Sequence, residues 1–137
     1  MKNKILKLAI ETALIAGEAI LNIYQNDNFE VTIKGDESPF TKADFVSNQI
    51  ICSSLKNTGI PVLSEEEKQI SFKIRKEWKN FWLIDPIDGT KEFIKKNDEF
   101  TVNIALIEDK SPILGVVYAP AKNIIYFSSR GEGAFKS

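Results

Sequence analysis

Polar residues recur at helical spacing near the start of the chain. Between residues 4 and 25 they stand three, four or seven positions apart and form one narrow stripe, which consists of Lys4, Lys7, Glu11, Glu18, Asn22 and Gln25. This spacing predicts an α-helix that buries most of its remaining, apolar surface in the protein core. Its charged residues interrupt the apolar stretch too often for a signal peptide or a transmembrane segment. We therefore expect a cytoplasmic protein, with peripheral association on the cytoplasmic side of the inner membrane as the alternative.

A second helix is predicted over residues 41–56. Thr41 can cap its N-terminus, and Asp44 follows three residues later, as in a capping box. Between the two helices, apolar and polar residues alternate over residues 29–34, and a turn-forming segment follows at residues 35–39. This pattern indicates a short strand and a loop.

Two apolar runs of strand length follow the second helix. Residues 60–63 form the first run, which leads into the acidic triplet of residues 65–67. Residues 81–84 form the second, and we expect this strand to end at Asp85 because Pro86 restricts the residue before it. Both runs are therefore predicted to be buried strands that end in carboxylates.

The remaining segments predict a helix and a series of strands. Residues 71–79 are compatible with a helix, and the later strands are expected at residues 101–107, 113–119, 124–128 and 133–136. Short turn-forming segments separate these strands, as in an antiparallel meander. The sequence thus predicts one α/β (α+β) domain over residues 1–137, with two long helices packed on a largely antiparallel sheet.

Composition restricts the chemistry that is available to the chain. The 137 residues are 43% hydrophobic, which suffices for a buried core, and the net charge of -1 gives no general attraction to nucleic acid polymers. The chain has no histidine, which excludes histidine-based nucleophiles and zinc sites. The single cysteine, Cys52, excludes an internal disulfide. Carboxylates and hydroxyls remain, and these favour an oxygen-liganded cation such as Mg²⁺.

One carboxylate segment follows the second predicted strand directly. After Asp85, Pro86 is expected to turn the chain so that Asp88 and the backbone carbonyl of Ile87 face the same point. Three oxygens would then converge on one cation. The alternative is an ordinary turn, because aspartate, proline and glycine are all common turn residues.

The residues after Asp88 indicate a neighbouring anion site. Gly89 permits a left-handed or closely approached backbone, and Thr90 can begin a helical turn whose free N–H groups face an anion. Glu65 and Glu66 end the other predicted strand, and ligand sites favour the ends of buried strands. For these two glutamates, the alternative is a solvated acidic loop.

Three motifs together resemble those of the lithium-sensitive inositol monophosphatase superfamily. They are Asp85-Pro86-Ile87-Asp88-Gly89-Thr90, Ser64-Glu65-Glu66 and Thr41-Lys42-Ala43-Asp44. Within that superfamily, residues 62–66, 89–94 and 100–107 are similar to those of the bacterial 3'(2'),5'-bisphosphate nucleotidases. The resemblance covers all 137 residues. It implies the N-terminal half of the layered αβαβα sugar-phosphatase fold, so that residues 1–137 would be its N-terminal metal-binding domain.

The resemblance also implies an activity and a set of site residues. The activity is Mg²⁺-dependent hydrolysis of adenosine 3',5'-bisphosphate, a small phosphorylated nucleotide, to AMP and phosphate by a metal-activated water, which removes a by-product of sulfur assimilation. The implied Mg²⁺ ligands are Glu65, Asp85, the Ile87 carbonyl and Asp88, and all of them except Asp85 also contact the substrate. Gly89 and Thr90 would contact the phosphate, while Glu65 and Thr90 would orient the water. Asp44 would lie near a third Mg²⁺, although the capping box with Thr41 explains it equally well.

The chain departs from the family pattern in one respect. Members are about twice as long, and their second half contributes a Trp-Asp-x-Ala-Ala-Gly segment whose aspartate completes the metal site. Neither Trp78 nor Trp82 is followed by aspartate. We therefore expect the C-terminal domain to be absent. This leaves as alternatives an impaired remnant that binds metal or nucleotide and an inositol or sugar phosphate phosphatase. A docking protein that self-associates through an apolar sheet face left open is a further alternative.

Overall fold

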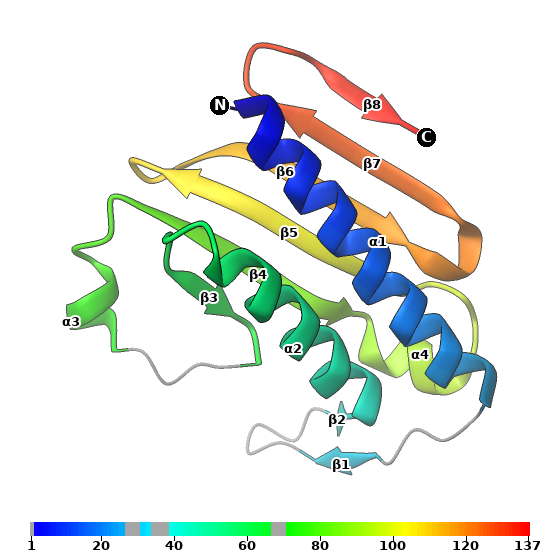
Figure 1. The fold of residues 1–137 in the computed structure, drawn as a ribbon. Helices are drawn as coiled ribbons and strands as arrows, with labels where there is room; N and C mark the ends of the chain where they lie inside the picture. Colours follow the sequence, from blue (N-terminus) through cyan, green and yellow to red (C-terminus); the bar gives the residue numbers. More distant parts are fainter. Residues whose placement is uncertain (1, 27–30, 34–38, 67–70) are drawn as a thin grey trace.

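A single mixed sheet with helices on one face forms the body of the protein (Figure 1). The computed structural model describes residues 2–26, 31–33, 39–66 and 71–137. The two long helices are α1 (Lys2–Asn26) and α2 (Lys42–Lys56), and both lie on the same face of the sheet. The predicted α/β class, with two long helices on a sheet, is confirmed.

Six strands form the sheet in the order β3-β4-β5-β6-β7-β8. Their bounds are β3 (Val62–Ser64), β4 (Asn80–Asp88), β5 (Thr101–Glu108), β6 (Ser111–Ala119), β7 (Ile124–Ser129) and β8 (Ala134–Lys136). β3 runs parallel to β4, whereas every later neighbour is antiparallel. The antiparallel meander expected from residue 101 onward is thus present. The only parallel pair of this sheet among the described residues is formed by the edge strand β3 and its neighbour β4.

Small residues let α1 approach the sheet closely. Ala9, Ala13 and Ala16 are fully buried, as is the larger Ile20, whereas the polar stripe faces outward. α2 begins after Thr41, whose side chain accepts a hydrogen bond from the Asp44 backbone while the Asp44 side chain accepts one from the Thr41 backbone. The capping box predicted from the sequence is therefore present and fixes the start of α2.

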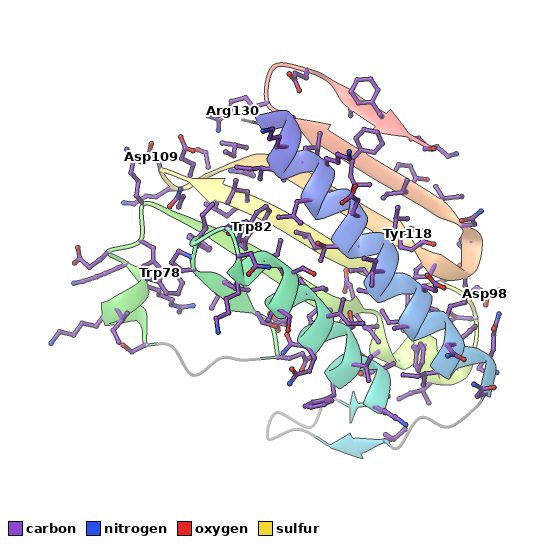
Figure 2. The ribbon with its side chains drawn as sticks, in the orientation of Figure 1. Trp78, Trp82, Asp98, Asp109, Tyr118 and Arg130 are labelled. Atoms are coloured by element: carbon purple, nitrogen blue, oxygen red, sulfur yellow. The ribbon has the colours of Figure 1, made fainter. Side chains whose placement is uncertain are left out.

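Gly17 lies where α1 crosses Tyr118, whose side chain projects from β6 toward the helix (Figure 2). A Cβ atom at this position would stand 2.5 Å from Cδ2 of Tyr118 and 3.1 Å from Cγ of Pro120. Gly17→Ala should therefore lower the free energy of unfolding by about 1–3 kcal/mol through overpacking, despite the higher helix propensity of alanine. Urea denaturation measures this change, with the exposed neighbour Glu18→Ala as control. A Gly17→Ala protein as stable as wild type would contradict this packing.

Short elements connect the main ones, and two of them differ from expectation. The helix predicted over residues 71–79 is limited to α3 (Phe72–Arg75). Its Ile74 is 60% exposed, so no buried apolar face supports a longer helix. Of the strand predicted at residues 29–34, β1 (Thr32–Ile33) pairs with β2 (Pro39–Phe40). Val31 is described but is not part of the strand, whereas residues 29, 30 and 34 and most of the turn lie outside the described residues.

The second face of the sheet has no helix on it within the described ranges. Cross-strand register places Leu83, Val117 and Tyr126 on this face, and they are 43%, 38% and 45% exposed. Their opposite-facing neighbours, such as Trp82 and Val116, are buried under the helices. An open apolar sheet face, as the docking alternative requires, is therefore present. None of the helices in the described residues is long and apolar enough to span a bilayer.

Candidate metal and phosphate site

Acidic residues lie at the ends of β3 and β4, which are adjacent and parallel (Figure 1). Ser64 pairs with Ile84, so the next residues along the two strands, Glu65 and Asp85, are neighbours. The Glu65 backbone N–H donates to the Ile84 carbonyl at 3.0 Å, which continues the pairing to this point. Carboxyl ends of parallel strands meet at the same edge of a sheet. The two acidic segments singled out in the sequence therefore lie side by side.

β4 does not end at Asp85, so that prediction was wrong. The strand continues to Asp88, with a register shift in which Asp85 pairs with Asn103 and Asp88 pairs with Thr101. Three steps along β4 thus match two steps along β5, which defines a β-bulge. In a regular strand, residues three apart face opposite sides of the sheet, whereas the bulge returns Asp88 to the side of Asp85. The bulge therefore gathers the two aspartates that a turn was expected to gather.

The bulge also explains how a proline fits inside the strand. Proline has no N–H for the ladder and is tolerated at bulges, where a residue is left unpaired. The Pro86 carbonyl accepts a hydrogen bond from the Ser47 hydroxyl at 2.8 Å. This contact ties the bulge to α2. The Ile87 side chain is buried, so Ile87 can contribute to a site only through its backbone carbonyl.

Asp85 has a strongly perturbed carboxyl group. Burial raises its pKa to about 7, and the negative charges of Asp88, Glu65, Glu66 and Asp44 add to this effect. Its Oδ1 atom is buried and has no hydrogen-bond partner among the described residues. A buried carboxylate oxygen without a donor, near other carboxylates, is unfavourable until a cation neutralises it. The donor set is all oxygen and anionic, and it therefore fits a divalent metal ion.

Asp88, Glu65, Glu66 and Asp44 lie near enough to Asp85 for their charges to act on it. Within the described part of the chain, no three acidic side chains form a ready-made ligand set. Glu65 and Asp88 are exposed, whereas Asp85 is half-buried. Mg²⁺ usually binds through one or two carboxylates together with waters and substrate phosphates, rather than in an all-protein cage. An open arrangement of this kind is compatible with a divalent cation that also takes water and phosphate oxygens as ligands.

Asp44 links α2 to the residues that follow β4. It is fully buried, and its Oδ2 atom accepts hydrogen bonds from the Thr41 backbone at 2.8 Å and the Thr41 hydroxyl at 2.7 Å. Its Oδ1 atom accepts a hydrogen bond from the Thr90 hydroxyl at 3.0 Å. The capping function of Asp44 is thus confirmed, and its proposed role near a third metal stays a prediction.

Gly89 and Thr90 form the junction between β4 and α4 (Thr90–Lys95). Gly89 has a φ of +95°, the left-handed conformation that the sequence analysis allowed for. α4 is held in place by Phe93, which is buried against the rings of Tyr24 and Phe100. Thr90 is therefore fixed both by its backbone and by its bond to Asp44. Contact of Gly89 and Thr90 with phosphate stays a prediction.

Asn103 is a site residue that the sequence reasoning missed. Its Nδ2 group donates to Oδ2 of Asp88 at 3.1 Å, and its Oδ1 atom accepts from the Thr101 hydroxyl at 2.8 Å. With Glu65 and Asp85 it lines a shallow cavity of about 320 Å³ whose floor is apolar and includes Leu83. The sequence does contain one sign of such a role, because Asn103 is the only polar residue in the otherwise apolar stretch of residues 102–107.

The raised pKa of Asp85 makes stability depend on pH. Between about pH 4 and pH 7 the unfolded chain releases this proton while the folded, metal-free protein retains it, so stability falls as pH rises through this window. Because Asp85 is partly exposed, we expect a loss of about 1–2 kcal/mol. Urea denaturation in chelator, with wild type compared with Asp85→Asn at each pH, isolates this contribution. A difference between the two proteins that stays constant from pH 4 to pH 8 would contradict the assignment.

Comparison with known proteins adds an independent line of support. The model of the inositol monophosphatase family matches residues 1–137. The 3'(2'),5'-bisphosphate nucleotidase CysQ of Escherichia coli (strain K12) is 48% identical over 120 residues, which are 85% of this chain and 48% of that protein. The crystal structure of CysQ from Bacteroides thetaiotaomicron has a TM-score of 0.86 at 46% identity, over 98% of this chain and 49% of that one.

A crystal structure of the extragenic suppressor protein suhB from Bartonella henselae has a similar backbone. Its TM-score is 0.88 at 28% identity, over 98% of this chain and 52% of that chain. These matches confirm the fold and the resemblance that the motifs indicated. The chain spans about half the length of the curated relatives it matches.

Proposed function

Since this chain belongs to the inositol monophosphatase family, we propose that residues 1–137 form the N-terminal metal-binding domain of a Mg²⁺-dependent phosphomonoesterase. The proposed reaction is hydrolysis of adenosine 3',5'-bisphosphate to AMP and phosphate. The observation that carries the proposal is the buried Oδ1 atom of Asp85, which has no hydrogen-bond partner among the described residues. It lies near other carboxylates, where the adjacent, parallel strands β3 and β4 end.

The metal ligands would be the carboxylates of Glu65, Asp85 and Asp88 together with the Ile87 carbonyl. A bound Mg²⁺ would neutralise charge on the phosphate and lower the pKa of a water molecule. Asp85 would bind the cation in its ionised form. Its raised pKa therefore predicts that metal affinity increases as pH rises through about 7.

Thr90 and Glu65 are proposed to orient the attacking water. The Thr90 hydroxyl donates its hydrogen to Asp44, so its oxygen lone pairs are available to accept a hydrogen bond. Asp44, fixed in turn by two bonds from Thr41, holds that hydroxyl in one orientation. Glu65 is exposed at the end of β3, where its carboxylate can accept a second hydrogen bond from the same water. Both residues are thus proposed as catalytic groups.

The proposed substrate follows from the names of the relatives and from the nucleotidase-like segments. Several curated relatives at 38–48% identity are named 3'(2'),5'-bisphosphate nucleotidase CysQ. Removal of adenosine bisphosphate formed in sulfur assimilation, in the cytoplasm, is the corresponding cellular role. An inositol or sugar phosphate substrate is the alternative that the assay must separate.

Phosphate release is the experiment that tests the proposed function. We expect the chain to release phosphate from adenosine 3',5'-bisphosphate with Mg²⁺, but not with EDTA and not after Asp85→Asn. Faster release from inositol 1-phosphate would change the substrate class. Metal binding without release from any phosphate monoester would identify a metal-binding remnant and contradict an active enzyme.

Self-association is proposed for the open sheet face. The exposed side chains of Leu83, Val117 and Tyr126 support it, because contiguous apolar surface favours association. Sedimentation velocity should show a dimer that Val117→Lys dissociates. A monomer at all concentrations would contradict this part of the proposal.

A further inference from the structure

Asn103 stands between the two aspartates that follow the apolar part of β4. Its backbone pairs with Asp85 across the β4–β5 ladder, yet its side chain donates to Asp88. Side chains of directly paired residues lie on the same face of a sheet, about 4.5–5.5 Å apart at Cβ. The Asn103 amide therefore lies beside Asp85 while it holds Asp88. No other described residue has a hydrogen bond to the Asp88 carboxylate in this structure.

The orientation of the Asn103 amide is set by its two hydrogen-bond partners, Asp88 on β4 and Thr101 on β5. The Thr101 hydroxyl donates to Oδ1 of Asn103, which leaves the Nδ2 group to face Asp88. An amide rotated by half a turn would place Oδ1 against the Asp88 carboxylate, which has no hydrogen to donate. The Thr101 hydroxyl can donate or accept, so it donates to Oδ1 once Asp88 has set the orientation of the amide. Thr101, Asn103 and Asp88 thus form a chain of directed hydrogen bonds, which specifies one position for the Asp88 side chain.

Asp88 needs such support because of where it lies. It is exposed, it is the last residue of β4 beyond the bulge, and it precedes Gly89 in the left-handed conformation. It is also repelled by Asp85, whose pKa it helps to raise. A neutral amide can hold the carboxylate without neutralising it, whereas a lysine or arginine at position 103 would compete with a cation for the same oxygens.

From this arrangement we propose that Asn103 is a positioning residue, which holds Asp88 at the distance from Asp85 that a shared divalent cation requires. The inference rests on the proposed metal site. It predicts that the loss of the amide weakens metal binding while the metal-free fold is retained. A purely structural contact would change the unfolding midpoint and leave the metal affinity of the folded protein unchanged.

The test is titration with Mn²⁺, an oxygen-liganded stand-in for Mg²⁺ that is detected directly by electron paramagnetic resonance. Asn103→Leu keeps the approximate shape of the side chain and removes the amide. We expect it to bind Mn²⁺ about 10–100-fold more weakly than wild type, as for other groups that support metal ligands. The matched control is the same substitution at the exposed, distant Asn22, which should leave Mn²⁺ affinity unchanged. Unfolding midpoints in chelator are measured for each protein.

A second pair of variants tests the chain of hydrogen bonds without changing Asn103. Thr101→Val removes the hydroxyl and should weaken Mn²⁺ binding, whereas Thr101→Ser retains the hydroxyl and should restore it. If Asn103→Leu does not fold, this pair decides the question.

Two results would overturn the inference. The first is an Mn²⁺ affinity of folded Asn103→Leu within about twofold of wild type, or equal affinity of the two Thr101 variants. Either outcome would refute the positioning role of Asn103 and leave the proposed metal site standing. Absence of Mn²⁺ binding to wild type would refute the metal site and the inference together.

Discussion

Replacing Asp85 with asparagine is expected to abolish divalent metal binding and at the same time to stabilise the metal-free protein. The weakening of Mn²⁺ affinity should exceed about 100-fold, because losing a ligand costs more than losing a group that supports one. Stability should increase above pH 7, because the substitution removes a charge that is half-buried beside other carboxylates. Calorimetric titration with Mn²⁺ and urea denaturation in chelator measure the two effects on the same samples.

The matched control for this variant is Asp109→Asn. Asp109 lies at the turn between β5 and β6, at the end of β5 opposite α4 (Figures 1 and 2). Its φ of +50° is a conformation that asparagine adopts as readily as aspartate. The control should therefore change neither property. An Asp85→Asn protein that binds Mn²⁺ as wild type does, or that is less stable than wild type in chelator at pH 8, would contradict the description of this residue.

Replacing Asp44 with alanine is expected to cause a large loss of stability. The substitution removes the acceptor of the Thr41 backbone N–H and hydroxyl, at a position with no solvent exposure. It also removes the acceptor of the Thr90 hydroxyl, which is partly exposed. The lost cap and the unsatisfied buried donors together should lower the free energy of unfolding by about 2–4 kcal/mol. Urea denaturation at constant pH measures the change.

Two further variants separate the capping function of Asp44 from its link to Thr90. Thr90→Val removes the hydroxyl alone and should cost much less stability than Asp44→Ala, because the capping box is retained. Asp44→Asn keeps one acceptor oxygen and should lie between the two. A Thr90→Val protein as unstable as Asp44→Ala would show that the cap contributes little, contrary to the structure.

The helices and the meander could be predicted because their signals are local. The polar stripe of α1 and the Thr41–Asp44 capping box each depend on residues within one or two turns of each other. Alternating or continuous apolar runs likewise defined β5, β6 and β7 to within two residues. The length of α3 was overestimated because the sequence does not show that Ile74 would find no partner in the core.

The site could be predicted only as a set of residue types. Apolar runs that end in carboxylates identified Glu65, Asp85 and Asp88, but the bulge that places two of them on one face arises from pairing with β5. The role of Asn103 depends on the same pairing. The bond between Asp44 and Thr90 joins residues 46 positions apart. Such contacts follow from the tertiary arrangement of strands, and no local pattern encodes them.

The most direct test of the metal site is a crystal structure of the chain grown with Mn²⁺, with anomalous diffraction used to locate the ion. The account predicts anomalous density at the ends of β3 and β4, in contact with oxygens of Asp85 and of Glu65 or Asp88. Ordered crystals that show Mn²⁺ only elsewhere on the molecule, or carboxylates of Glu65 and Asp88 turned away from Asp85 in saturating Mn²⁺, would contradict it.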